Sequence, residues 1–250
     1  MKVFAIYAIK GGVGKTAASV NLAWCAANAG YRTLLFDLDA QGSASYYYRV
    51  RAKKKFNAQK LISGDKDIYK QIKGSDFENL DIIPSGLKQR NIDLELLNVK
   101  KSQQRLNKVL KPLRSEYDII LLDCPPNLTL LSENIFDAAD SVLTPVIPTT
   151  LSERTLEQLI TFFKKEDIPL SKLRPFFSMT QRTKTLHKDV MDRLLESGKP
   201  QFFTKDIPFL SAIEQMGETR EPVTLSSPAS RASHAYRKLW NEIEDELIEE

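Results

Sequence analysis

The sequence predicts an α/β fold, a mostly parallel twisted sheet with helices on both faces. Short apolar runs recur along the chain with helix-like segments between them, which is typical of βαβ units. Several runs, such as residues 119–122, show no polar alternation, as expected for strands buried on both sides. The predicted strands are Val3–Ile9, Thr33–Leu38, Leu80–Pro84, Tyr117–Asp123, Ser141–Pro148 and Arg174–Met179.

Two helices can be predicted from the spacing of apolar residues. The first repeats apolar side chains every three or four residues over residues 156–163, with Ser152 as the expected N-cap. The second lies near the C-terminus and is expected to pack on the sheet. The apolar side chains of the first are Leu156, Leu159, Ile160 and Phe163, and those of the second are Ala232, Tyr236, Leu239, Trp240, Ile243 and Leu247.

The chain is expected to form one domain over residues 1–250. Its 250 residues are 42% hydrophobic, which is enough to bury a sizeable core. Residues 49–76 are the least regular part, with turn signals at residues 63–65 and 74–76. No repeat or low-complexity linker divides the sequence.

No segment resembles a signal peptide or a membrane span. The apolar run at residues 1–8 is too short for a signal-peptide core and continues into a glycine-rich loop. No apolar run approaches the roughly 20 residues that cross a bilayer. The two cysteines, Cys25 and Cys124, lie in apolar runs without the paired spacing of metal or redox sites. We therefore expect a cytoplasmic protein.

Charge is distributed unevenly along the chain. The net charge is +4, but Glu242–Glu250 contains six acidic residues and no basic one. Residues 1–241 therefore carry 36 basic against 26 acidic residues, a net charge of +10. Basic residues cluster at residues 49–55 and along residues 88–114. Such clusters attract phosphate-rich polymers, although each is equally typical of a solvated helix face.

A glycine-rich loop follows the first predicted strand and precedes a helix that starts near Lys15. It reads Lys10-Gly11-Gly12-Val13-Gly14-Lys15-Thr16. The glycines let backbone N–H groups converge on phosphate oxygens, and the helix N-terminus adds positive potential. Lys15 would reach the β and γ phosphates of a nucleotide, and the Thr16 hydroxyl would ligate Mg²⁺. The sequence thus predicts a nucleotide site over Lys10–Ala17.

The start of this loop departs from the general phosphate-loop pattern. Ile9 stands where the first glycine is expected, and a second lysine, Lys10, follows it. This arrangement resembles the deviant Walker A motif of the ParA/MinD family of ATPases. The resemblance implies a P-loop NTPase fold, ATP or ADP with Mg²⁺, and a homodimer that sandwiches ATP. In that dimer Lys10 would reach the phosphates of the partner's nucleotide, whereas without the resemblance it is only a nearby counter-charge.

Two carboxylates, Asp37 and Asp39, lie at the carboxyl end of the second predicted strand, where α/β sheets collect ligands. The segment resembles the first switch of the family. On that match Asp39 would position the attacking water and join the metal site, and Asp37 would support the metal or the switch. Ala40 and Ser43 stand where proline and asparagine are usual, which leaves the switch geometry open.

The run at residues 117–123 is a hydrophobic strand that ends in Asp123, as a Walker B element requires. Asp123 is therefore the expected metal-side residue. The following Cys124-Pro125-Pro126 resembles the second switch, which places Pro125 near the nucleotide and makes Cys124 a spectator. Two scattered cysteines cannot ligate the iron–sulfur cluster of some wider relatives.

Gln181 and Pro208 are candidates for contact with adenine. Gln181 follows a predicted strand, and Pro208 belongs to an Ile-Pro pair that lies beside the nucleobase in relatives. A strand-end turn and a helix-leading proline explain the two residues equally well. Their assignment rests on the resemblance alone.

The predicted reaction is ATP hydrolysis, slow and stimulated by a partner. Lys10, Lys15 and Mg²⁺ would stabilise charge while Asp39 orients water. The family includes partition proteins that bind DNA non-specifically, Min-type proteins that bind membranes, and metabolic or assembly enzymes. The acidic C-terminus would be repelled by anionic lipid, whereas the surplus of +10 favours DNA held through its phosphates.

We therefore predict an ATP-dependent dimer on the nucleoid that segregates or positions a plasmid, a chromosome region or a protein cargo. A ParB-like protein or cargo adaptor is the expected partner, and no membrane is expected. The alternatives are a MinD-like membrane-associated positioning ATPase, a metabolic or assembly P-loop ATPase, and a scaffold that never turns nucleotide over. The chain begins at its first strand, so we expect the small type without an N-terminal helix-turn-helix domain.

Candidates for DNA contact come from charge and the amphipathic pattern alone. Residues 207–211 lack the basic side chains that many partition relatives carry after the same Ile-Pro pair, so no contact is transferred there. Each candidate is also compatible with an ordinary surface position. The candidates are Arg220, Arg231, Arg237 and Lys238.

Overall fold

The computed structural model describes residues 1–63, 68–99 and 102–249. Its strands are β1 (Lys2–Ile6), β2 (Thr33–Asp37), β3 (Lys73–Gly74), β4 (Leu80–Ile83), β5 (Ile119–Asp123), β6 (Ser141–Val146), β7 (Leu173–Thr180) and β8 (Ile207–Pro208). They form an eight-stranded sheet in the order β3-β4-β2-β5-β1-β6-β7-β8. Each described pair is parallel except β3 with β4. The predicted mostly parallel sheet is confirmed.

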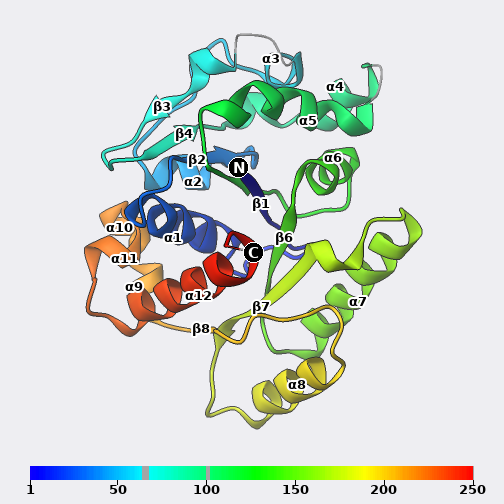
Figure 1. Cartoon of the computed structure of the whole chain (residues 1–250), viewed down its shortest axis with the longest axis vertical. Helices are drawn as coiled ribbons and strands as arrows, with labels where there is room; N and C mark the ends of the chain where they lie inside the picture. Colours follow the sequence, from blue (N-terminus) through cyan, green and yellow to red (C-terminus); the bar gives the residue numbers. More distant parts are fainter. Residues whose placement is uncertain (64–67, 100–101, 250) are drawn as a thin grey trace.

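Helices cover both faces of this sheet (Figure 1). The α-helices are α1 (Lys15–Asn28), α2 (Ser43–Tyr47), α3 (Ala58–Ser63), α4 (Ile92–Leu97), α5 (Arg105–Leu110), α6 (Leu130–Ala138), α7 (Thr150–Lys165), α8 (Thr185–Glu196), α9 (Ser211–Glu214), α10 (Met216–Thr219), α11 (Val223–Ser226) and α12 (Arg231–Leu247). The 3₁₀ helices are η1 (Tyr69–Gln71), η2 (Leu87–Gln89), η3 (Ser102–Gln104), η4 (Lys111–Ser115) and η5 (Leu170–Lys172). One apolar core lies between the sheet and α3–α8, and a second lies between the sheet and α1 with α12.

Central strands contribute alternate side chains to the two cores. On β1, Val3 belongs to the core under α3–α8, and Phe4 belongs to the core under α1 and α12. On β5, Ile120 belongs to the core under α3–α8, and Ile119 belongs to the core under α1 and α12. A strand that is buried on both faces has no solvent-facing row, which explains why these runs lack polar alternation.

All six predicted strands are present, with small differences at their ends. The first ends at Ile6 although the apolar run extends to Ile9, because the chain there leaves the sheet for the glycine-rich loop. The edge strands β3 and β8 were not predicted, since two residues carry no periodicity. The predicted turn at residues 74–76 joins β3 to β4, where Ser75 N donates to Leu80 O. The predicted turn at residues 63–65 lies outside the described residues.

The N-terminus of α7 corrects one prediction. Thr149, and not Ser152, is the N-cap, because its extended backbone lets Thr149 Oγ1 accept from Ser152 N at 3.4 Å. Ser152 instead lies in the first turn, where its Oγ is 3.1 Å from Thr149 Oγ1. Both residue types favour N-caps, so their order along the chain could not be decided by type. The apolar stripe of α7 is buried as predicted at Leu156, Leu159 and Phe163.

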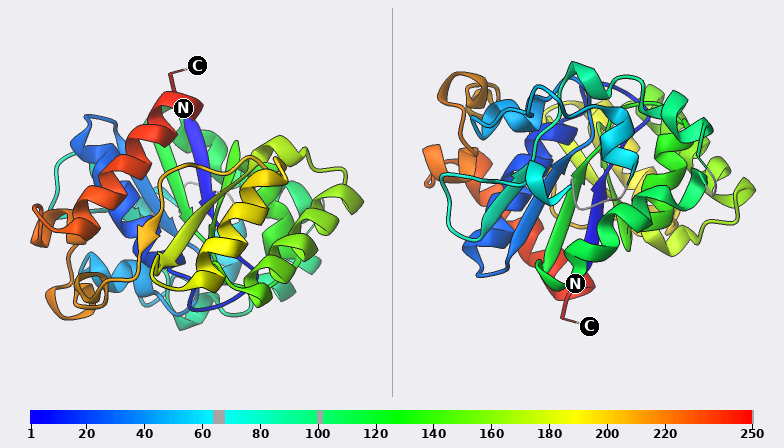
Figure 2. Two further views of the ribbon diagram at one scale, coloured as in Figure 1. Left: turned by 90° about the horizontal axis from the view of Figure 1, so that it is seen from below. Right: turned by 90° about the horizontal axis from the view of Figure 1, so that it is seen from above.

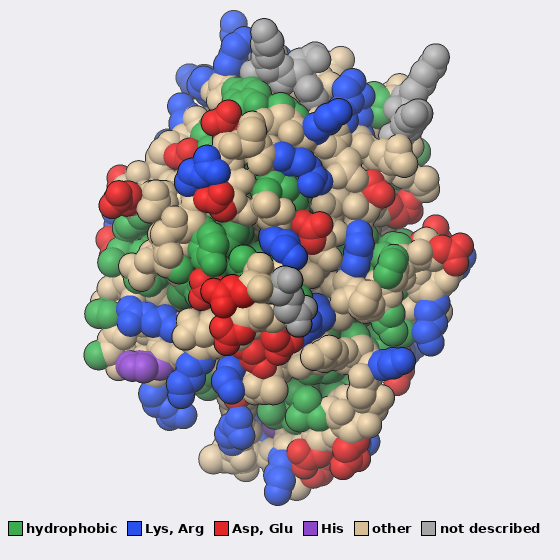
Figure 3. Space-filling view, in the orientation of Figure 1, with side chains coloured by type: hydrophobic (Ala, Val, Ile, Leu, Met, Phe, Trp, Pro, Cys, Tyr) green, Lys and Arg blue, Asp and Glu red, His purple; other side chains and the backbone are tan. Residues whose placement is uncertain are grey.

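The closing helix α12 packs against α1 and the sheet, as predicted. Its basic side chains lie near its start and its acidic side chains near its end, where they gather on the surface (Figure 3). Two of these acids hold the fold together: Glu242 accepts from Thr204 N and Lys205 N, and Glu246 pairs with Arg174. The two chain ends lie beside each other at one end of the molecule (Figure 2). Within the described residues, no helix combines the length and apolarity that membrane crossing requires.

The packing of α12 can be tested at Leu239, which is fully buried. Leu239→Ala should lower the free energy of unfolding by about 2–5 kcal/mol, because it removes buried methyl groups and leaves a cavity. Urea unfolding followed by circular dichroism measures this loss. Asn241→Ala, on the exposed face of the same helix, is the control and should change stability by no more than about 0.5 kcal/mol.

Candidate functional site

The glycine-rich loop joins β1 to α1 as an open cradle. Gly12 and Gly14 have φ angles of 72° and 89°, a left-handed conformation that suits glycine. A Cβ added to Gly11 or Gly12 would meet nothing within 4 Å, so the concave side of the loop has room for a ligand. Its underside is fixed to β7, where Ser178 Oγ donates to Val13 O at 2.9 Å. The loop therefore presents its backbone at a fixed position.

The two lysines of the loop lie in different environments. Lys15 is 7% exposed, and its Nζ donates to Lys10 O at 3.1 Å, which turns the ammonium group back over the cradle. Burial lowers the pKa of Lys15, and nearby Asp123 opposes this shift. The side chain of Lys10 is exposed. Lys15 thus belongs to the cradle, and Lys10 is available to a group outside it.

Asp123, at the end of β5, is held by two hydroxyls from α1. Thr16 Oγ1 donates to Asp123 Oδ2 at 3.0 Å, and Ser19 Oγ donates to Asp123 Oδ1 at 2.7 Å. The carboxyl group is fully buried, and burial raises its pKa. The structure therefore joins the predicted Walker B acid to the predicted metal-ligating hydroxyl of Thr16.

Asp37 pairs in register with Asp123 across β2 and β5, which brings two buried carboxyl groups together. Burial, and secondarily the charge of Asp123, raises the pKa of Asp37. Its Oδ2 accepts from the backbone N and the hydroxyl of Ser45, and its Oδ1 accepts from Asp39 N at 3.2 Å. Asp37 therefore holds the first switch, while its role beside the metal stays a prediction.

The first switch, residues 38–45, turns back over the end of β4. Asp39 Oδ1 accepts from Gln41 N at 2.9 Å, which closes a local turn at the partly exposed Asp39. Ser45 Oγ accepts from Ser85 N at 2.9 Å. A Cβ on Gly42 would lie 3.1 Å from Ser85 O, so glycine permits the close approach. These contacts fix the switch geometry that the sequence left open.

These residues fit a nucleotide with Mg²⁺ better than a free metal ion. Among the described residues, no group of three or more His, Cys, Asp or Glu side chains could hold a metal ion. Mg²⁺ commonly binds one or two protein oxygens together with phosphate oxygens and water. Thr16 and Asp123 supply such oxygens beside the cradle, and the two buried carboxyl groups favour a nearby cation.

The second switch begins at Cys124 and is tied to the residue that follows β1. Tyr7 OH donates to Asn127 O at 2.9 Å, and Asn127 has a φ of 106°. Pro125 is half-buried after Asp123, on the same edge of the sheet as the cradle. Burial raises the pKa of the Cys124 thiol well above its usual value, which favours the unreactive thiol form.

The candidates for adenine contact lie together beyond the end of β7. Gln181 and Pro208 line one open cavity of about 890 Å³. Gln181 N donates to His187 Nδ1 at 3.2 Å, and Arg182 forms an ion pair with Asp206 on the cavity wall. The end of β7 that precedes this cavity lies close to the cradle, since a Cβ on Gly14 would lie 3.6 Å from Met179 Cε.

The four candidates for DNA contact do not share one environment. Arg231 and Lys238 are exposed on α12 and line the same cavity as Gln181 and Pro208. Arg237 donates to Thr224 O and lies over the ring of Trp24. Arg220 donates to Tyr46 O and lines a different pocket, near the first switch.

Three serines of the site were missed by sequence reasoning: Ser19, Ser45 and Ser178. Ser19 had a usable signal, since it follows Lys15 by four residues and Thr16 by three on the same helix face. Ser45 and Ser178 had none, because their partners lie on other elements. A serine is too common a residue to be singled out without its contacts.

Comparison with known proteins identifies the family. Residues 1–171 match the model of a family described as an AAA domain. The sporulation initiation inhibitor protein Soj of Bacillus subtilis is 30% identical over 249 residues, covering 97% of this chain and 98% of that protein. The chain belongs to the ParA/MinD family of ATPases. The exposed Lys10 beside the buried Lys15 is the form that the deviant Walker A motif takes in this member.

Two solved structures share the fold of this family member. A putative plasmid partition protein from Borrelia burgdorferi, bound to AMPPNP, has a TM-score of 0.81 and 25% identity, covering 98% of this chain and 97% of that one. Cobyrinic acid a,c-diamide synthase from Mycobacterium smegmatis, with an ATP analogue and magnesium, has a TM-score of 0.82 and 22% identity, covering 96% and 93%. At 22% identity the second likeness shows the fold alone.

The cradle can be tested at Gly14, where a Cβ would lie 3.0 Å from Ser178 Oγ and the φ is 89°. Gly14→Ala should cost about 1–3 kcal/mol of stability and weaken ATP binding, because relief of the strain moves the loop. Titration with a fluorescent ATP analogue and urea unfolding measure the two effects. Gly198→Ala is the matched control, since Gly198 also has a positive φ but nothing within 4 Å of its Cβ. It should lose stability and retain ATP binding.

Proposed function

We propose that this ParA-like positioning ATPase works as an ATP-sandwich homodimer that binds DNA without reading its sequence and moves a cargo. The observation that carries the proposal is the division between the two lysines of one loop. Lys15 is buried over the cradle, whereas Lys10 is exposed and its side chain makes no described hydrogen bond or ion pair. Because Lys10 lies at the rim of the phosphate site, its ammonium group can bind a phosphate of the nucleotide held by a second chain.

In this proposal each residue of the cradle has a task in hydrolysis. The loop amides and Lys15 would hold the β and γ phosphates of ATP, and Thr16 with Asp123 would hold Mg²⁺. Mg²⁺, when bound, neutralises charge on the phosphate oxygens. Asp39 extends from a switch that Asp37 fixes, so its free oxygen can orient the attacking water. Lys10 of the second chain would add positive charge as negative charge develops.

Non-specific DNA binding is supported by the exposed side of α12. Arg231, His234 and Lys238 are exposed at spacings of three and four residues, so they follow one helix face. Phosphate contacts of this kind carry no sequence information. Gln181, proposed beside adenine, lines the same cavity as Arg231 and Lys238. Occupancy of the nucleotide site can therefore influence DNA binding through a shared wall.

A nucleoid-bound dimer needs a partner that resets it, and we propose a ParB-like or cargo adaptor protein that stimulates hydrolysis. The similar protein from Borrelia burgdorferi is named for plasmid partition, which supports a segregated cargo of this class. The acidic end of α12 is unsuited to an anionic membrane, which disfavours a MinD-like membrane role. Two of its acids are also occupied by contacts to residues 174 and 204–205.

The two lysines should separate nucleotide binding from dimerisation. Lys15→Ala should abolish ATP binding, because it removes the cation inside the cradle. Lys10→Ala should retain ATP binding and lose ATP-driven dimerisation. Nucleotide titration and sedimentation velocity with ATP measure the two properties. Equal ATP-driven dimerisation of the wild type and Lys10→Ala would show that Lys10 does not act across the interface.

DNA binding should require ATP and should weaken steeply as salt rises. Arg231→Ala/Lys238→Ala should reduce the slope of log K against log salt by about 2 per chain, since each lost phosphate contact removes about one. The measurement is fluorescence anisotropy with a duplex oligonucleotide, with ATP, ADP or no nucleotide. Lys164→Ala/Lys188→Ala removes the same charge from exposed positions on α7 and α8 and should bind as the wild type does. Binding that ignores nucleotide or salt would contradict the proposal.

A further inference from the structure

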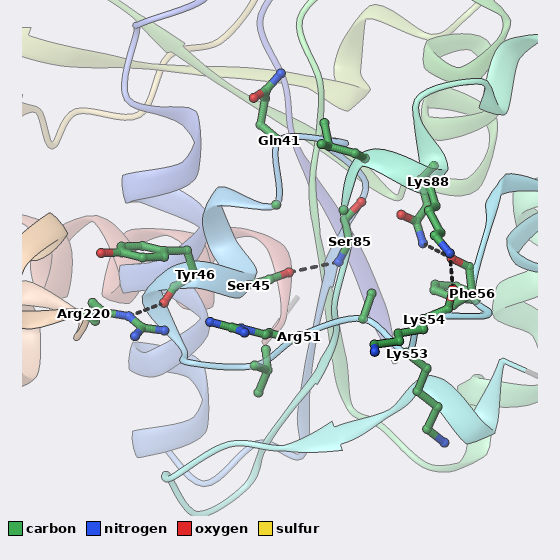
Figure 4. Close-up of a pocket in the computed structure, with 16 residues that line it drawn as sticks. Gln41, Ser45, Tyr46, Arg51, Lys53, Lys54, Phe56, Ser85, Lys88 and Arg220 are labelled. Atoms are coloured by element: carbon green, nitrogen blue, oxygen red, sulfur yellow. Dashed lines mark hydrogen bonds between the residues drawn. The ribbon is translucent and has the colours of Figure 1, made fainter.

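A second pocket, of about 390 Å³, lies beside the first switch (Figure 4). Its walls come from the switch with α2, from the segment that follows α2, from η2, and from the end of α10. No residue of the phosphate loop lines it, so it is separate from the nucleotide cradle. We call it the basic pocket, because its charged lining residues are Arg51, Lys53, Lys54, Lys88 and Arg220.

The charge of the basic pocket is not balanced within the described part of the chain. No Asp or Glu lines it, and none of its five cations forms a described ion pair. Arg49, from the same sequence cluster, is a contrast, since it pairs with Asp76 and Glu221. Like charges held together in a concave site raise the local positive potential and favour an anion.

Backbone carbonyl groups hold several of these cations in place. Arg220 Nε donates to Tyr46 O at 3.0 Å, and its guanidinium lies 4.4 Å from the centre of the Tyr46 ring. Lys88 donates to Lys54 O, and Lys53 donates to Lys70 O. Each ammonium group keeps further N–H donors for a ligand. Figure 4 shows Arg220 and Lys88 on opposite sides of the pocket.

The inner wall joins the basic pocket to the first switch. The hydrogen bond from Ser85 N to Ser45 Oγ crosses between the two cationic sides (Figure 4). Ser85 Oγ and Gln89 Oε1 are buried lining atoms without a hydrogen-bond partner in the described structure. The Ser85 hydroxyl can donate to a phosphate oxygen and so gain the partner that it lacks, whereas Gln89 Oε1 can only accept and does not favour a phosphate. A ligand seated there would contact the switch that carries Asp39.

We propose that the basic pocket binds a small ligand that carries two or more phosphate groups. Because the cations lie on two opposite sides of the pocket, a ligand with two separated anionic groups fits it better than a ligand with a single anionic group. The volume lies in the range of small-molecule sites. Duplex DNA would meet the exposed rim without reaching the buried Ser85 and Gln89. The site is independent of the proposed DNA contacts on α12.

Isothermal titration calorimetry with inorganic tripolyphosphate tests the proposal. The protein is saturated with ADP in EDTA at about 0.15 M salt, so that the cradle is filled and diffuse attraction is screened. We expect one tripolyphosphate per chain without displacement of a fluorescent ADP analogue. Arg51→Ala should raise the Kd about tenfold or more, because Arg51 lines the pocket and is exposed. Lys55→Ala, an exposed cation of the same segment that does not line the pocket, should leave the Kd unchanged.

Several outcomes would overturn the proposal. If Arg51→Ala and Lys55→Ala weaken tripolyphosphate binding equally, the ligand is attracted to the charged segment in general and not to the basic pocket. Displacement of the ADP analogue would place tripolyphosphate in the cradle. Absence of binding, or competition by a duplex oligonucleotide that binds more tightly than tripolyphosphate, would remove the small-ligand site. Thermal unfolding of both variants confirms that each is folded in the titration.

Discussion

The contact between Asp123 and the start of α1 is the interaction on which the rest of the site depends. Two hydroxyls, from Thr16 and Ser19, reach across to a carboxyl group at the end of the central strand β5. This contact fixes the first turn of α1 relative to the sheet, and therefore fixes the phosphate loop that precedes it. Because the carboxyl group is fully buried, it keeps a raised pKa and a strong preference for a neighbouring cation. The group that anchors the loop is therefore also the predicted metal-side acid.

A series of contacts connects the Asp123 carboxyl group to the surface of the molecule. Asp37 lies beside Asp123 in the sheet and accepts hydrogen bonds from the first switch, and Ser45 continues the series to Ser85. The basic pocket begins at that last contact. The switch is therefore held between the nucleotide cradle on one side and the basic pocket on the other.

Much of the fold could be predicted because strand burial leaves a strong mark in sequence. The six apolar runs became six strands, and the apolar stripes of α7 and α12 became their buried faces. Predictions failed where neighbouring residues had the same local preference, or where an element was too short to show a pattern. Thr149 and Ser152 are both good N-caps, and only the extended backbone after β6 selects Thr149. The two-residue strands β3 and β8 depend on neighbours that are distant in sequence.

By itself the sequence determined the phosphate loop, its paired lysines and the acids after two strands, because these functions need particular residue types at fixed spacing. Only the tertiary structure decided which lysine is buried, which serines anchor Asp37, Asp123 and the loop, and that Gln181 shares a cavity with Arg231. It also divided the basic residues at 49–55, pairing Arg49 with acids and turning Arg51 toward a pocket. The physical reason is that charge and hydrogen-bonding capacity belong to a residue type, whereas burial and partners depend on elements brought together from distant parts of the chain.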